Sequence, residues 1–108
     1  MTISAWVKPS TSLPQWPAVV MKERTGELTY ALYANSDTAQ PNINYTSNNA
    51  EVNLNAGSAV PVNTWTHLAG TFDGSMLRFY VNGQLVGSKA TSALIDTTTG
   101  VLRIGGDS

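Results

Sequence analysis

The chain has 108 residues, no cysteine and a formal net charge of −1, with 12% charged residues. The length suits one small domain, and the lack of cysteine excludes disulfides and thiolate metal sites. The near-neutral charge predicts no binding of nucleic acid, and without an apolar run of the ~20 residues that span a bilayer we predict no membrane insertion.

Period-two alternation dominates the sequence, and no stretch has a convincing helical pattern. The predicted strands, separated by turn and loop residues, are Thr2–Lys8, Ala18–Lys22, Leu28–Ala34, Asn42–Thr46, Glu51–Asn55, Trp65–Phe72, Met76–Val81, Gln84–Lys89 and Val101–Ile104. Short strands at near-regular spacing are typical of an antiparallel sandwich or barrel, so we predict an all-β fold of that kind.

The dipeptide Asn82–Gly83 is the strongest hairpin signal in the chain. Both residue types tolerate the positive φ of a type I′ turn, and a two-residue loop fixes the register of its strands. That register pairs Phe79 with Val86 and places both on one face of the sheet, together with Leu77 and Val81.

The single histidine, His67, lies two residues after Trp65 and six before Asp73. At about 3.3 Å per residue along one strand, His67 and Asp73 are roughly 20 Å apart, too far for a catalytic pair. We therefore interpret His67 as a scaffold residue that shares a face with Trp65, its ring nitrogens bonded to backbone or hydroxyl groups. The sequence also lacks a nucleophile elbow and a phosphate-binding glycine loop, so no catalytic residue is predicted.

The acidic residues favour turns and charged corners over catalysis. Glu23 and Glu27 flank the RTG turn beside Lys22 and Arg24, whereas a glycosidase needs two carboxylates across a sugar-binding cleft. The remaining candidates are loop aspartates: Asp37, Asp73, Asp96 and Asp107. Turn formation is the simpler role for them, and calcium binding is the alternative, with Asp73 and Asp107 as its candidate ligands. Calcium is the one cofactor that the sequence suggests.

The segment NTWTHLAGTFDGSMLRFYVNGQLVGSKA resembles the laminin-G-like jelly-roll domains of the concanavalin A-like lectin/glucanase superfamily. These often read W-x-H-(V/L)-A-G-x-(Y/F)-D-G, then L-x-(L/F)-Y-V-N-G. The segments TISAWVKPS, AVVMKERTGELTYALY and GVLRIGGDS also resemble parts of such domains. The residues that carry the signature are Trp65, His67, Asp73, Gly74, Tyr80, Asn82 and Gly83. The resemblance implies an antiparallel two-sheet jelly-roll sandwich, formed by residues 1–108 as one domain.

The family pattern also contains a strand upstream of ISAWVKP and a closing strand after GVLRIGGDS, and neither matches this sequence. The resemblance therefore implies exposed sheet edges, which are templates for association. We expect the chain to form a homo-oligomer through edge pairing or strand exchange. A shortened excerpt of a longer polypeptide remains the alternative.

The resemblance implies a non-catalytic accessory module that binds carbohydrate or protein ligands in a secreted or cell-surface protein, although the sequence contains no export signal of its own. Sugar binding needs exposed aromatic rings with amide groups nearby. The candidates are Trp16, Tyr33, Tyr45, Asn35, Asn48 and Asn49. For Trp16 and the two tyrosines, packing in the core is an equal alternative.

Two other functions are weighed against sugar binding. The first is a structural or protein-interaction jelly-roll that assembles through its strand edges. The second, a glycoside hydrolase fragment, is disfavoured because the compact E-x-D-x-x-E or E-x-D-x-E run of hydrolases with this fold is missing.

Overall fold

The computed structural model describes residues 1–10, 17–24, 27–36, 38–48 and 50–105. Within these ranges the chain forms strands β1 Thr2–Val7, β2 Ala18–Arg24, β3 Glu27–Tyr33, β4 Asn42–Ser47, β5 Ala50–Asn55, β6 Thr66–Phe72, β7 Met76–Val81, β8 Gln84–Ala90 and β9 Leu102–Ile104. Each predicted strand is present, and its ends differ from the prediction by at most two residues. None of the described residues belongs to a helix long and apolar enough to cross a membrane.

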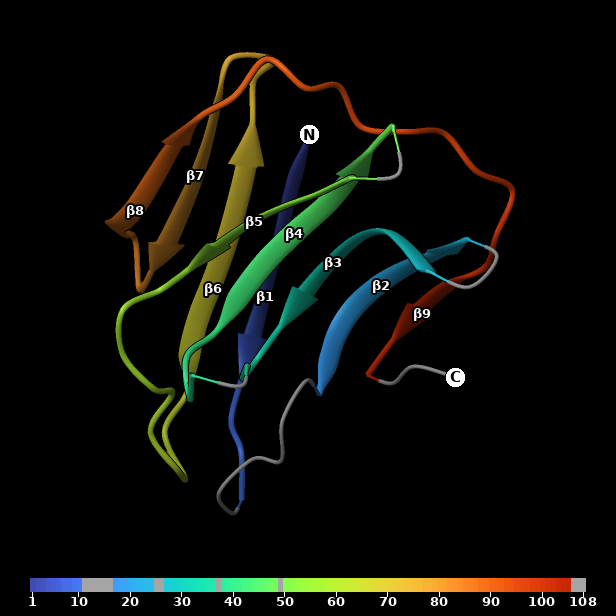
Figure 1. Ribbon diagram of the computed structural model, residues 1–108. Coiled ribbons are helices and arrows are strands. Elements are labelled where there is room, and N and C mark those ends of the chain that lie inside the picture. The colour runs from blue at the N-terminus through green and yellow to red at the C-terminus, as the bar shows by residue number, and fades with distance from the viewer. Residues whose placement is uncertain (11–16, 25–26, 37, 49, 106–108) are drawn as a thin grey trace.

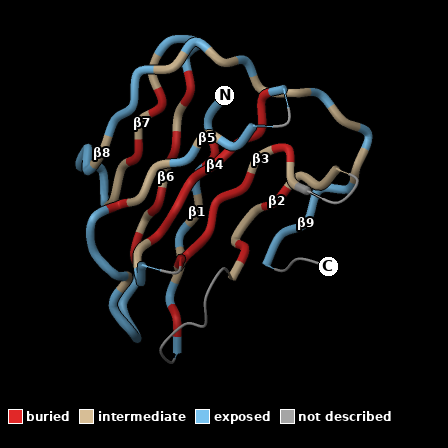
Figure 2. The backbone as a smooth tube through the Cα atoms, viewed as in Figure 1, coloured by how far each residue is buried: buried red, intermediate tan, exposed pale blue. Residues whose placement is uncertain are grey.

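The strands form two antiparallel sheets that pack face to face (Figure 1). One sheet has the order β1-β6-β7-β8, and the other has the order β5-β4-β3-β2-β9. The prediction of an all-β antiparallel sandwich is therefore confirmed. Buried residues are concentrated along β3 and β4, whereas β8 and β9 are largely exposed (Figure 2).

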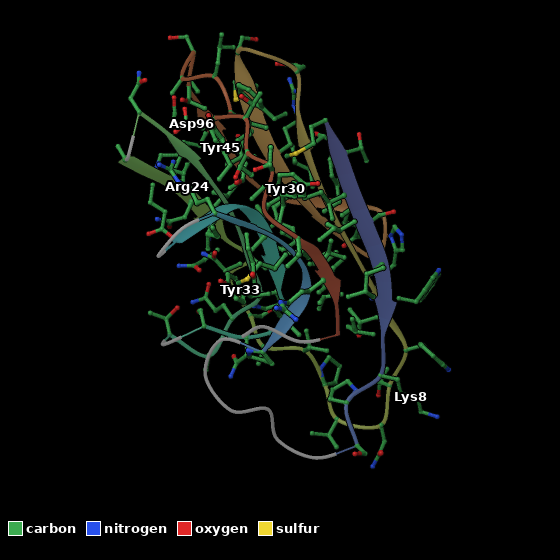
Figure 3. All side chains as sticks on the ribbon, turned by 90° about the vertical axis from the view of Figure 1, so that its right-hand side faces the viewer. Lys8, Arg24, Tyr30, Tyr33, Tyr45 and Asp96 are labelled. Atoms are coloured by element: carbon green, nitrogen blue, oxygen red, sulfur yellow. The ribbon has the colours of Figure 1, made fainter. Side chains whose placement is uncertain are left out.

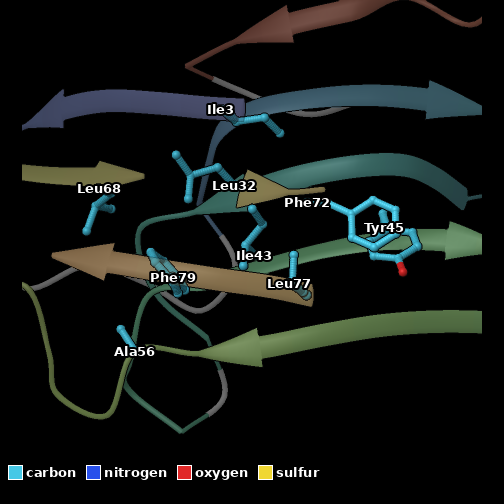
Figure 4. Packing of buried hydrophobic residues seen from close by; sticks show 9 residues of the cluster. All are labelled: Ile3, Leu32, Ile43, Tyr45, Ala56, Leu68, Phe72, Leu77 and Phe79. Carbon is cyan, nitrogen blue, oxygen red and sulfur yellow. The ribbon is translucent and has the colours of Figure 1, made fainter. Parts of the chain in front are cut away.

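The hydrophobic core lies between the two sheets. Its buried members come from both of them: Ile3, Leu32, Ile43, Tyr45, Ala56, Leu68, Phe72, Leu77 and Phe79 (Figure 4). Close packing of the sheets depends on Gly70 of β6, because a Cβ atom there would lie 1.7 Å from Cδ1 of Ile43. The bare backbone of Gly70 thus leaves space for the Ile43 side chain of the facing sheet.

The hairpin between β7 and β8 has the predicted turn but not the whole predicted register. Asn82 and Gly83 have φ values of 51° and 80°, as a type I′ turn requires. The register then shifts between Phe79 and Tyr80, so that Phe79 pairs with Gly87. The prediction that Val86 pairs with Phe79 and shares its face is wrong, because Gly87 takes that position and Val86 is 40% exposed. The cause is a β-bulge in which Val86 is the extra residue and points outward. Gly87 occupies the position opposite Phe79, where a Cβ atom would lie 3.3 Å from Cδ1 of Leu54.

The segment between β8 and β9 is held against one end of the sandwich. The Tyr45 hydroxyl donates a hydrogen bond to the carbonyl of Ala93 at 2.6 Å. The backbone N–H of Asp96 donates to the carbonyl of Thr46 at 2.9 Å, and the Asp96 carboxylate pairs with Arg24 at 2.9 Å. These contacts lie near the Phe72 end of β6, because the Tyr45 and Phe72 ring centres are 5.1 Å apart. The opposite end of β6 carries the site described next.

Candidate ligand-binding site

Two exposed tryptophans lie at one end of the four-stranded sheet, on its solvent face. Trp6 of β1 is 63% exposed, and Trp65, which directly precedes β6, is 59% exposed. Solvent exposure of this extent is unusual for tryptophan, which is highly buried on average. With His67, Asn82 and Gly83 they line an open depression with a volume of about 500 Å³.

Strand alternation explains why Trp6 points to solvent. Ile3 is buried and contributes to the core, whereas Ser4 and Lys8 of the other face are exposed. Trp6 belongs to this second, polar set, because side chains two residues apart lie on the same face of a strand. The sequence signal for this site was an aromatic residue, Trp6, on the otherwise polar face of the alternating pattern. Trp6 was not among the candidate binding residues predicted from the sequence.

His67 connects Trp6 to the turn that closes the depression. It pairs with Trp6 in the β1–β6 register, and the two ring centres are 5.1 Å apart. The His67 backbone N–H donates to Oδ1 of Asn82 at 2.9 Å, and the Asn82 N–H donates to the His67 carbonyl at 2.8 Å. These two bonds fix the Asn82–Gly83 turn against β6, so the depression is built on paired strands.

The prediction that His67 and Trp65 share a face is consistent with this structure, because both line the depression. The expectation that the His67 ring nitrogens bond backbone or hydroxyl groups is wrong within the described residues. His67 is partly exposed, its ring lies against Trp6, and its hydrogen bonds there come from its backbone. The imidazole is therefore available to a ligand in the depression.

The tyrosines predicted as sugar platforms are buried, so that expectation is corrected. Tyr45 is 0% exposed and packs between the sheets, where its ring contacts Phe72. Tyr33 is 6% exposed and packs with Ala31 and Met21 on the other face of the five-stranded sheet. Neither ring offers a face to a sugar. Figure 3 shows Lys8 near the end of β1, well away from both tyrosines.

The predicted amide groups do not converge on one place. Asn35 follows β3 near the beginning of β4, whereas Asn48 follows the end of β4, so about 20 Å of strand separates them. Asn48 has a φ of 50° and donates its backbone N–H to Oδ1 of Asp96 at 3.0 Å, which is a turn role. Trp16 and Asn49 lie outside the described residues.

Asp73 organises the turn between β6 and β7. Its Oδ1 accepts hydrogen bonds from the backbone N–H groups of Ser75 and Met76, both at 2.9 Å, and from the Ser75 hydroxyl at 3.0 Å. Its Oδ2 pairs with Arg78 at 2.9 Å. These contacts, led by the Ser75 N–H bond, hold the pKa of the Asp73 carboxyl well below its usual value of 3.8.

These contacts favour the turn role of Asp73 over calcium binding, since its oxygens are already engaged. Among the residues that the structure describes, no group of three or more histidine, aspartate or glutamate side chains is arranged to hold a metal ion. Asp37 and Asp107 lie outside the described residues. Glu23 of β2 forms an ion pair with Arg103 of β9, and Asp96 of the segment before β9 forms one with Arg24 of β2. Both ion pairs therefore join β2 to the part of the chain around β9.

Asp73→Ala should therefore destabilise the protein in a pH-dependent way. The folded-state pKa of Asp73 is lowered, so its carboxylate contributes stability above pH 3.8, and this contribution is lost as the pH falls through the folded value. Thermal unfolding followed by circular dichroism should show a lower Tm for the variant at pH 7 and a shrinking difference toward pH ~2. A difference in Tm that is equal at both pH values would contradict this role.

The fold is an antiparallel two-sheet β-sandwich with an open depression at one end of its four-stranded sheet. The family model described as the concanavalin A-like lectin/glucanases superfamily, a laminin G type, matches residues 1–108, and the chain belongs to this family. Comparison with curated proteins finds no match.

Among solved structures, the chain is similar to the binding domain of Paraclostridial Mosquitocidal Protein 1, with a TM-score of 0.74 and 16% sequence identity. The match covers 98% of this chain and 29% of that chain. At this identity the likeness extends to the fold, which confirms the jelly-roll sandwich. Membership of this family supports a binding module.

Proposed function

We propose that the chain is a non-catalytic module that binds carbohydrate in the depression formed by Trp6, Trp65, His67 and the Asn82–Gly83 turn. The exposure of the two indole rings at one end of a sheet is the observation that supports this most directly. Sugars stack their apolar faces on aromatic rings, and polar groups at the edge bind their hydroxyls. Laminin G-like domains are typically extracellular, where glycans are abundant, and we propose that location for this module.

The depression suits a ligand more than a second protein surface. Its polar side chains are few: the His67 imidazole and Asn82, whose Oδ1 accepts a hydrogen bond from the His67 backbone N–H at 2.9 Å. A small number of fixed polar groups beside exposed aromatic rings is typical of small-ligand sites. A volume of about 500 Å³ accommodates a short oligosaccharide segment rather than a protein domain.

A glycan array probed with the purified chain tests the proposal. Binding to a defined set of glycans, lost in the Trp6→Ala and Trp65→Ala variants, is the expected result. The matched control is Leu94→Ala, because Leu94 is 69% exposed and lies in the segment held at the opposite end of the sandwich. If the array shows no glycan binding, or if binding persists in both tryptophan variants, the proposal is wrong.

A second candidate function is assembly through strand edges, and the exposure of β9 favours it. Leu102 is 54% exposed and Ile104 is 80% exposed on this strand, which lies at the edge of the five-stranded sheet. Apolar side chains on an exposed edge strand are a template for pairing with another chain. We propose a second copy of this chain as the partner at this edge.

Light scattering over a concentration series, with and without calcium, tests assembly. The mass should rise above that of one chain, and Ile104→Lys should lower it because a charged edge residue opposes strand pairing. Thr99→Lys adds a lysine to an exposed loop position before β9 and serves as the charge-matched control. A mass of one chain at every concentration would overturn the assembly proposal and leave the carbohydrate proposal unaffected.

A further inference from the structure

Each exposed tryptophan of the depression lies beside a basic side chain. Lys8 Nζ lies 5.9 Å from the ring centre of Trp65. The His67 imidazole lies 5.1 Å from the ring of Trp6. Trp6 of β1 and Lys8, just after that strand, are two residues apart and share a face, as do Trp65, just before β6, and His67 of β6. The two basic groups therefore alternate with the two indole rings over one small area.

The acidic side chains that the structure describes lie away from the depression. Asp73 pairs with Arg78 beyond the other end of β6. Glu23 and Asp96 pair with arginines near β9, and Glu51 lies on β5 of the other sheet, opposite Thr46. No carboxylate lines the depression among the residues that the structure describes. A ligand there meets the His67 imidazole, with Lys8 beside the Trp65 ring, and no described acid, although the net charge of the chain is −1.

We infer that the depression selects sugars that carry a carboxylate, such as uronic or sialic acid residues. This inference rests on the proposed carbohydrate function and names its ligand class. The sugar ring stacks on an indole, and the carboxylate lies against Lys8 and His67.

The test uses a glycan array on which each uronic or sialic glycan is paired with its carboxyl-reduced neutral counterpart. The acidic member should bind about two- to fivefold more tightly for each basic group engaged, which is the range of partly exposed ion pairs. Its advantage should shrink at high salt, because ions screen exposed charges. Separate uronic and sialic arms identify which carboxylated sugar the depression accepts.

Variants assign the preference to the basic groups. Lys8→Met keeps an apolar stem and removes the charge, so it should reduce the ratio of acidic to neutral binding. His67→Gln should also reduce this ratio, because it removes the basic group beside Trp6. Lys89→Met is the matched control, because Lys89 lies on β8 and its Nζ points to the carbonyl of Asn53. It should leave the ratio unchanged.

The outcomes separate the two proposals. Equal binding of both members of each pair would overturn the preference for carboxylated sugars and leave the carbohydrate function intact. An unchanged ratio in Lys8→Met and His67→Gln would overturn the assignment to these residues. Binding of neither member would overturn the carbohydrate function itself.

Discussion

Replacing Trp6 with alanine should weaken glycan binding about ten- to hundredfold while leaving the protein folded. Stacking one face of an indole against a sugar removes on the order of 100 Å² of apolar surface from water, equivalent to about 2.5 kcal/mol. Some of this is offset by lost motion, which gives a loss of about 1.4–2.8 kcal/mol. Tryptophans that lose exposed surface on binding are typical affinity hot spots.

The stability of the Trp6→Ala variant should change little, because Trp6 is mostly exposed and its described ring contact is with His67. Isothermal titration calorimetry with the glycan selected on the array measures the loss, and urea unfolding measures the stability. Trp6→Phe should recover part of the affinity, because it restores an aromatic face. An affinity equal to that of the wild type in Trp6→Ala would contradict the assignment of the depression as the binding site.

Phe79→Ala should lower the free energy of unfolding by about 3–5 kcal/mol. Phe79 is 0% exposed and lies on β7 among core residues of both sheets (Figure 4). Its removal loses the burial of the ring and leaves a cavity, since Leu77 and Ile43 are themselves buried and can relax only in part. For a domain with a total stability of about 5–15 kcal/mol, such a loss leaves a marginal fold.

Urea unfolding monitored by tryptophan fluorescence measures this loss. Leu85→Ala is the control, because Leu85 lies on the neighbouring strand but is 54% exposed, and it should change the stability by no more than about 0.5 kcal/mol. A loss below about 1 kcal/mol for Phe79→Ala would show that the ring is not closely packed between the sheets.

The strands were predictable because their information is local. Period-two alternation and turn residues located each strand, and Asn82–Gly83 located the tightest turn with its positive φ values. The bulge at Val86 was not predictable from the same pattern. It depends on the space that Leu54 of the facing sheet leaves above Gly87, which is a contact between residues far apart in the sequence.

The site was harder to predict than the fold, because exposure of an aromatic residue depends on what covers its face of the sheet. Tyr45 and Trp6 both lie on alternating strands, yet Tyr45 faces the core and Trp6 faces solvent. The neighbours of Trp6 in the pattern, Ser4 and Lys8, are polar, whereas those of Tyr45 include the apolar Ile43. Applying the alternation to each aromatic residue would have found Trp6 and excluded Tyr45.

The basic character of the depression also depends on tertiary structure. Lys8 and Trp65 are far apart in the sequence and meet because β1 pairs with β6 in one register. A shift of one residue in that register would turn Trp6 toward the core and away from His67. The site is therefore a product of the sheet pairing rather than of any short motif.

An NMR titration of the isotope-labelled chain with the glycan selected on the array locates the ligand on the sandwich. The largest shifts should occur at the indole N–H groups of Trp6 and Trp65 and at the backbone N–H groups of His67 and Gly83. Shifts concentrated around Asn48 or along β9, with the two indoles unaffected, would contradict the proposed site and place the ligand elsewhere on the sandwich.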